Sequence, residues 1–158
     1  MEAGQLVAHQ GIFWPSRPDW DTYFLDIADA VAARADCRRR QHGAVIVKNN
    51  RIVSTGYNGA PAGEKGCLAG HCPRGLLSYD ELKTMSSYDT GPGRCISIHA
   101  EQNALLYSSR QDHEGGIIYI TGEPCPTCRR LIGGSGLAYI RWRDGDILVN
   151  WHVASYSG

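Results

Sequence analysis

Two short motifs constrain the fold of this chain more than any other feature, because their side chains must meet at one point. The first is His99-Ala100-Glu101, and the second is Cys125-Pro126-Thr127-Cys128. One imidazole and two thiolates are typical zinc ligands, and three protein ligands leave the fourth tetrahedral position open for water. We therefore predict a catalytic zinc ion bound by His99, Cys125 and Cys128, with Glu101 moving protons to and from its water.

Each motif also predicts a helix that begins at the metal. Successive residues of a helix are rotated by about 100°, so His99 and Glu101 can both face one ion only if a helix starts there. Pro126 favours the first turn of a second helix, which Gly133-Gly134 would end. A helix N-terminus beside the two cysteines would stabilise the thiolates that zinc requires.

Neither motif is specific alone. A single C-x-x-C also occurs in redox pairs and in structural zinc sites, and H-x-E is common by chance. Here the two motifs occur together and in order, separated by a strand-like segment at residues 117–121. The combination favours a catalytic site, because a structural zinc has no need of the proton-transfer group that Glu101 provides.

Composition limits the class of substrate. At 158 residues the chain is large enough for a core, and we expect one domain spanning residues 1–158. Lysine plus arginine and aspartate plus glutamate both number 16, and this balance favours a small-molecule substrate over nucleic acid. The sequence shows neither a long apolar run nor a signal-peptide pattern, so we expect a cytoplasmic protein whose cysteines are metal ligands or free thiols.

Hydrophobic periodicity predicts an α/β fold of three layers, α/β/α. Residues 1–18 are expected to form an irregular arm, and Asp19 to cap a helix that follows it. Strands are expected at residues 44–47, 51–55, 117–121 and 137–142, and an edge strand within 147–153. This order favours a central mixed sheet of about five strands with helices on both faces. The helix after Asp19 should bury a stripe made of Trp20, Tyr23, Phe24, Ile27, Ala28 and Val31.

Two stretches upstream of the zinc motifs are candidates for substrate binding. Residues 56–63 are rich in glycine, and Asn58 within them can both donate to and accept from a sugar hydroxyl or a base edge. Arg39 and its arginine neighbours at 38 and 40 can bind phosphate through planar hydrogen bonds. For the arginines, a solvated basic corner is an equally good interpretation.

Residues 64–97 resemble an insertion, in which a capping box from Ser78 to Glu81 predicts one short helix. A loop of this length is uncommon without something to order it, and a closed zinc site would do so. Buried free thiols and a surface histidine are the alternative. The candidate ligands outside the catalytic set are Cys37, Cys67, His71, Cys72 and Cys95.

The sequence resembles the deoxycytidylate (dCMP) deaminase branch of the cytidine deaminase-like zinc deaminases, over roughly residues 20–142. The zinc motifs are shared by that whole superfamily, whereas the Gly-Tyr-Asn-Gly stretch at 56–59 is typical of the deoxycytidylate branch. The matching stretches are Cys37–Val47, Ser54–Gly63, His99–Ala104 and Pro124–Cys128.

The resemblance implies hydrolysis of dCMP to dUMP and ammonia, in a cytidine deaminase-like fold that commonly forms homo-oligomers. It implies that the backbone at Ala100 and Cys125 holds the base edge and that Asn58 holds the sugar. It also implies a second zinc in the region of Cys37, Cys67 and Cys95, completed by His71 or Cys72. Either Trp14 or Trp151 is a candidate for a subunit interface.

Two other functions compete with this one. The first is deamination of another cytosine nucleotide, such as CMP, dCTP or a modified pyrimidine; deamination of adenosine in RNA is disfavoured by the neutral charge. The second is a non-catalytic, zinc-stabilised interaction module of the same fold. The chain also departs from the family at Arg141-Trp142-Arg143, where relatives often place an aromatic residue near the substrate.

Overall fold

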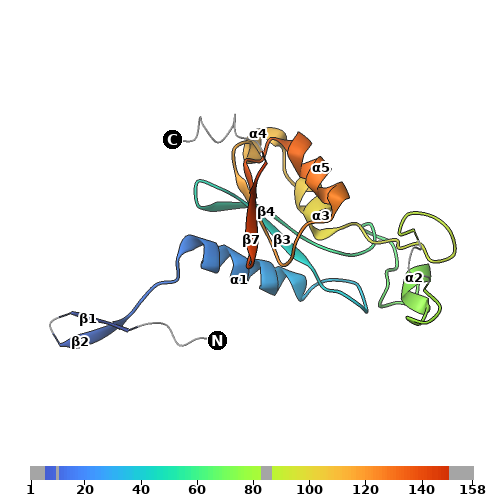
Figure 1. Ribbon diagram of the computed structural model, residues 1–158, viewed down its shortest axis with the longest axis horizontal. Helices are drawn as coiled ribbons and strands as arrows, with labels where there is room; N and C mark the ends of the chain where they lie inside the picture. The colour runs from blue at the N-terminus through green and yellow to red at the C-terminus, as the bar shows by residue number, and fades with distance from the viewer. Residues whose placement is uncertain (1–5, 10, 83–86, 150–158) are drawn as a thin grey trace.

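The computed structural model describes residues 6–9, 11–82 and 87–149, without the side chains of residues 6–9, 13 and 14 (Figure 1). The elements in chain order are β1 (Leu6–His9), β2 (Ile12–Pro15), α1 (Trp20–Ala32), β3 (Gly43–Lys48), β4 (Arg51–Tyr57), α2 (Pro73–Leu76), α3 (Ala100–Leu106), α4 (Arg110–His113), β5 (Ile117–Ile120), α5 (Pro126–Ser135), β6 (Tyr139–Trp142) and β7 (Gly145–Leu148). In the part of the chain so described, no helix has the length and apolar character needed to cross a membrane.

Five strands form a central mixed sheet in the order β4-β3-β5-β6-β7. Strand β3 is antiparallel to both β4 and β5, β5 is parallel to β6, and β6 is antiparallel to β7. The predicted β3–β4 hairpin is confirmed, because Asn49 and Asn50 both have positive φ (52° and 56°), as a two-residue turn of this type requires. The predicted edge strand exists but lies earlier than expected, and residues 150–158, including Trp151, fall outside the described part.

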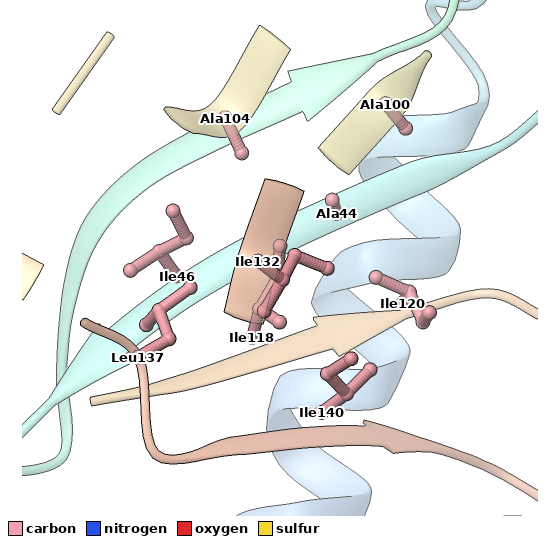
Figure 2. Packing of buried hydrophobic residues seen from close by; sticks show 9 residues of the cluster. All are labelled: Ala44, Ile46, Ala100, Ala104, Ile118, Ile120, Ile132, Leu137 and Ile140. Atoms are coloured by element: carbon pink, nitrogen blue, oxygen red, sulfur yellow. The ribbon is translucent and has the colours of Figure 1, made fainter. Parts of the chain in front are cut away.

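Helices cover both faces of this sheet, as predicted: α1 lies on one face, and α3 and α5 on the other (Figure 1). Strand β3 is buried on both sides, so its successive side chains enter two different cores. On the α1 side, Val45 and Val47 pack with Phe24 and Tyr119. Figure 2 shows the opposite cluster, which is made of Ala44, Ile46, Ala100, Ala104, Ile118, Ile120, Ile132, Leu137 and Ile140.

Two glycines in the hairpin allow the helices to approach the sheet closely. A Cβ atom at Gly43 would lie 2.0 Å from the carbonyl oxygen of Ala28 in α1. A Cβ atom at Gly56 would lie 2.2 Å from the carbonyl oxygen of Ala100 in α3. Because neither distance is sterically possible, the absence of a side chain at Gly56 sets how deeply the first turn of α3 sits against β4.

The buried stripe of α1 differs from the prediction at its N-terminal end. Asp19 caps the helix as expected, accepting a hydrogen bond of 2.7 Å from the Thr22 N–H. Trp20 and Tyr23, however, are 55% and 44% exposed, although their rings contact the buried Phe24. The face that enters the core is rotated toward Leu25, with the result that the two large aromatic rings form its exposed edge. The side chains buried along α1 are Phe24, Leu25, Ala28 and Ala32.

The prediction of an irregular N-terminal arm is wrong. Strands β1 and β2 pair as an antiparallel hairpin, which extends away from the sheet and helices in Figure 1. Gly11, with φ of +78°, provides the backbone conformation that the tight turn requires. Pro15 suggested a break in structure, but it occupies the last position of β2, where a strand tolerates proline.

The insertion contains less helix than expected in the part that the structure describes. The capping box is present, since the Ser78 N–H donates to Glu81 Oε2 (2.7 Å) and the Glu81 N–H donates to Ser78 Oγ (3.3 Å). Only turns follow it as far as Leu82, and residues 83–86 lie outside the described range. The helix that does form is α2, which was not predicted, and it follows Cys72 with proline at its first position.

Candidate active site and metal centre

Both predicted helix starts meet at one point, on the α3–α5 side of the sheet. His99 is the residue before α3, and Cys125 is the residue before α5. The His99 N–H donates to Gln102 Oε1 (2.9 Å), a local bond that holds the backbone of His99 at the start of its helix. Pro126 occupies the first turn of α5, and the Cys128 N–H points at Cys125 Sγ (3.4 Å).

The three predicted ligands have the geometry of a zinc site. His99 Nδ1 lies 3.6 Å from Cys125 Sγ and 3.4 Å from Cys128 Sγ. A tetrahedral zinc with ordinary bond lengths holds a nitrogen and a sulfur ligand about 3.5 Å apart, so these atoms need almost no movement to bind it. Among the described residues, this is the only group of three or more His, Cys, Asp or Glu side chains whose ligand atoms all lie within 4.8 Å of one another.

The chemistry of the thiols also fits a divalent cation. Burial raises the pKa of the Cys128 thiol well above its usual value, and the nearby Glu101 carboxylate and Cys125 raise it further. Without a cation the Cys128 sulfur is therefore protonated at neutral pH, and a bound zinc would displace that proton. A sulfur that is unfavourable as a bare thiolate becomes a good ligand once the positive charge is present.

Glu101 lies next to the ligands without being one of them. It occupies the first turn of α3, where the helix dipole favours a negative charge, and only 9% of it is exposed. Its carboxylate acts on the pKa of Cys128 and also on that of His42, so it is close to both side chains. A buried carboxylate beside the ligands of a zinc site is suited to moving protons.

The predicted substrate residues are close to the site, but their side chains are engaged with other parts of the chain. Asn58 Oδ1 accepts from the His42 N–H (2.7 Å), and Asn58 Nδ2 donates to the Arg40 carbonyl (3.0 Å). Asn58 therefore shapes the segment before β3. Ala100 is buried at the start of α3. The roles given to Asn58 and Ala100 in substrate binding stay predictions.

The arginines at 38 and 39 bind the insertion. Arg38 donates to the Gly75 carbonyl (2.8 Å), and Arg39 donates to the Arg74 carbonyl (3.1 Å) and to that of Leu77. The Arg39 guanidinium also lies 4.6 Å from the centre of the Tyr79 ring. A phosphate contact by Arg39 stays a prediction, and its observed contacts hold α2 and the residues after it against the loop before β3.

The arginines at 141 and 143 contact α1, whereas Trp142 between them packs against the cluster on the α3–α5 side of the sheet. Arg141 forms an ion pair with Asp21 (2.6 Å), which also accepts from the Tyr119 hydroxyl (2.7 Å). Arg143 binds Asp26 (2.9 Å) and Asp29. The two arginines therefore fasten α1 to strand β6 and to the turn that follows it.

Four of the five other candidate ligands gather between the loop before β3 and the insertion. Cys72 Sγ and Cys95 Sγ are 3.9 Å apart, and a Cβ at Gly75 would lie 2.5 Å from Cys67 Sγ and 3.8 Å from Cys72 Sγ. Cys37 acts on the pKa of both Cys67 and Cys95, which burial raises. Burial also opposes ionisation of Cys72, but hydrogen bonds to its sulfur from the Ile96, Gly75 and Arg74 backbone and from Cys95 lower its pKa. His71 is exposed.

Three residues at the site were missed by the sequence analysis. Gln102 has a recognisable signal, because a glutamine three residues after a helix start is typical of a capping box. Thr121 and His42 do not: their side chains meet at 3.3 Å, yet 79 positions separate them. Only the pairing of β3 with β5 brings them together.

A family model described as the cytidine and deoxycytidylate deaminase zinc-binding region matches residues 18–141 of the chain. A deoxycytidylate deaminase of Mycobacterium phage D29 is 52% identical over 122 residues, which are 77% of this chain and 92% of that protein. The deoxycytidylate deaminase of Schizosaccharomyces pombe is 40% identical over 122 residues. This match covers 77% of the chain but only 36% of the yeast protein, so the chain spans about a third of that relative.

Solved structures share the fold. The dCMP deaminase from the cyanophage S-TIM5, solved in complex with dCMP and dUMP, has a TM-score of 0.59 and is 26% identical. That match covers 80% of this chain and 82% of the other. The predicted cytidine deaminase-like fold is therefore confirmed.

Proposed function

Because the chain belongs to the cytidine and deoxycytidylate deaminase zinc-binding family, we propose that it catalyses the hydrolytic deamination of dCMP to dUMP and ammonia. The observation that carries the proposal is the convergence of His99, Cys125 and Cys128 at two helix N-termini, with the buried Glu101 beside them. The phage relative that bears this activity in its name matches over nearly its whole length, which supports dCMP as the substrate.

The chain's own residues supply the binding and the proton transfers. His99, Cys125 and Cys128 would hold a zinc ion, which when bound makes a water molecule acidic enough to react near neutral pH. Glu101 would carry one proton of the attacking water to the pyrimidine ring nitrogen and then the second proton of that water to the leaving amine. The water oxygen ends as the carbonyl oxygen of dUMP and the amine leaves as ammonia. The backbone at Ala100 and Cys125 would hold the base edge.

The experiment that tests the substrate is an ammonia-release assay with dCMP, CMP, dCTP and deoxycytidine. We expect the highest kcat/KM with dCMP. A clear preference for another of these compounds would keep the deamination and overturn the substrate, whereas a zinc-loaded protein that releases no ammonia from any of them would favour a non-catalytic module.

We also propose a second, structural zinc ion, bound by Cys37, Cys67, Cys72 and Cys95. Four thiolates make a closed tetrahedral site, and these four sulfurs tie the loop before β3 to both ends of the insertion. To bind one ion they must move closer together than they lie without it. Gly75 supports the arrangement, since a side chain there would overlap Cys67 Sγ. Of the two residues that the sequence left open as the fourth ligand, we propose Cys72, because it is buried beside Cys95 whereas His71 is exposed.

Zinc content per chain tests the second site. We expect about two zinc ions in the unaltered protein, about one in Cys95→Ser, and two in the matched control His71→Ala. The loss of one zinc from His71→Ala, with no loss from Cys72→Ser, would show that the fourth ligand is His71 and not Cys72. A content of one zinc in the unaltered protein would remove the second site.

Finally, we propose that the chain forms a homo-oligomer, as its family resemblance implies. Exposed apolar side chains at the end of α3 and on α5 support a contact on this face; they are Leu106, Tyr107 and Leu131, with exposed fractions of 68%, 69% and 46%. Light scattering after size-exclusion chromatography tests it: we expect a mass above that of one chain, reduced in Leu106→Glu. A monomeric mass for the unaltered protein would refute it.

A further inference from the structure

His42 stands at the edge of the metal centre and takes no part in the mechanism given above. It is the residue before β3, and its N–H donates to Asn58 Oδ1 (2.7 Å). Its ring reaches across to the end of β5, where Nδ1 lies 3.3 Å from Thr121 Oγ1. The chain then continues from Thr121 through a short loop to Cys125, so the imidazole borders the segment that brings this ligand into place.

The hydrogen bonds around Thr121 favour one protonation state of the imidazole. Thr121 Oγ1 accepts from the Gly43 N–H (3.2 Å), so its own proton is available for His42 Nδ1. With Nδ1 as the acceptor, the ring is neutral and carries its hydrogen on Nε2, which points away from Thr121. The pKa agrees: burial lowers it, with Arg40 and His99 adding to the effect and Glu101 opposing it.

The position of Glu101 relates this ring to the reacting atoms. The Glu101 carboxylate acts electrostatically on Cys128 and on His42, so it lies near a metal ligand and near the imidazole. In the proposed reaction the amine-bearing carbon sits at the metal and the ring nitrogen next to it faces Glu101. We expect a flat pyrimidine that meets both conditions to lie beside Glu101, where the exposed ring of His42 is near enough to contact it.

We propose that the His42 side chain forms a wall of the substrate pocket and packs its ring against the pyrimidine of the bound nucleotide. The inference rests on the proposed function, which supplies the orientation of the base. A neutral, flat imidazole held at one edge by Thr121 is suited to stacking and poorly suited to binding a phosphate. His42 should therefore contribute to recognition of the base and not to recognition of the 5′ substituent.

Comparing dCMP with deoxycytidine as substrates tests the proposed contact between His42 and the base. We expect His42→Ala to lower kcat/KM by about 5- to 150-fold, the range for loss of a stacking contact, and by the same factor for dCMP and deoxycytidine. The matched variant His42→Phe keeps a flat face without ring nitrogens and should regain most of the loss. Both variants should keep the zinc content of the unaltered protein.

An unchanged kcat/KM in His42→Ala would overturn the inference. So would a loss of kcat/KM confined to dCMP, which would indicate a phosphate contact. A loss of zinc from both variants would also overturn it, because it would indicate a structural role. Failure of the proposed function is separate, because the unaltered protein would then release no ammonia. In that case calorimetry of dCMP binding to the unaltered and His42→Ala proteins decides the inference: equal affinities, or no binding, would refute it.

Discussion

Gly56→Ala should displace the helix that carries His99 and Glu101. The added Cβ would lie 2.2 Å from the Ala100 carbonyl oxygen and 2.4 Å from the Ala104 N, whereas ordinary contact begins at 3.4 Å. Both obstacles are backbone atoms, so α3 must move by about 1 Å and no side-chain rotation relieves the overlap. We expect a loss of about 3 kcal/mol, the upper end of the usual range for overpacking, which lowers the Tm by roughly 6–12 °C for a domain of this size.

Gly134→Ala is the matched control, because it makes the same chemical change in α5 at a position where the Cβ meets nothing within 4 Å. Alanine is the better helix former, so this variant should gain about 0.5–1 kcal/mol. Calorimetric melting of the zinc-loaded proteins, together with their zinc content, measures both effects. A Gly56→Ala protein that melts with the unaltered one and retains all its zinc would refute the close-packing argument.

Two further perturbations act at the metal centre. Gln102→Ala removes the acceptor of the His99 N–H hydrogen bond, so we expect zinc affinity, measured by chelator competition, to fall roughly tenfold. The control Gln102→Glu keeps an acceptor and should keep the affinity of the unaltered protein. Equal affinities for all three proteins would contradict the role of this bond. Zinc affinity should also rise between pH 6 and 8, by about tenfold per pH unit for each proton displaced. The reason is that burial raises the pKa of the Cys128 thiol and keeps it protonated in the metal-free chain. An affinity independent of pH would show that the thiolate forms without zinc.

The parts of the site that follow from short-range geometry could be predicted from the sequence. A single residue separates His99 from Glu101, and because both must face the same ion a helix start is the only solution; both helices begin where this reasoning places them. The hairpin at Asn49 and Asn50 is similarly local, since two residues with positive φ specify the turn. Residue pattern and length were enough for four strands of the sheet, whereas the edge strand β7 lies earlier than expected.

The parts that depend on contacts distant in sequence could not. The orientation of His42 is set by Thr121, and the exposure of Trp20 and Tyr23 depends on the rotation of α1 against β3 and β5. The roles of Arg38 and Arg39 were open for the same reason, because a run of three arginines looks the same in sequence whether it binds phosphate or backbone carbonyls. In the structure, Gly75 and Leu77 provide such carbonyls.

Substitution of Glu101 by glutamine tests the account's central claim most directly. Glutamine has nearly the same shape and leaves His99, Cys125 and Cys128 untouched, but it cannot accept the proton of the attacking water. Ammonia release from dCMP and zinc content should be measured on the same samples of the unaltered and Glu101→Gln proteins. We expect the variant to retain its zinc and to lose turnover by at least about a hundredfold. A zinc-loaded Glu101→Gln protein with the activity of the unaltered one would contradict the account.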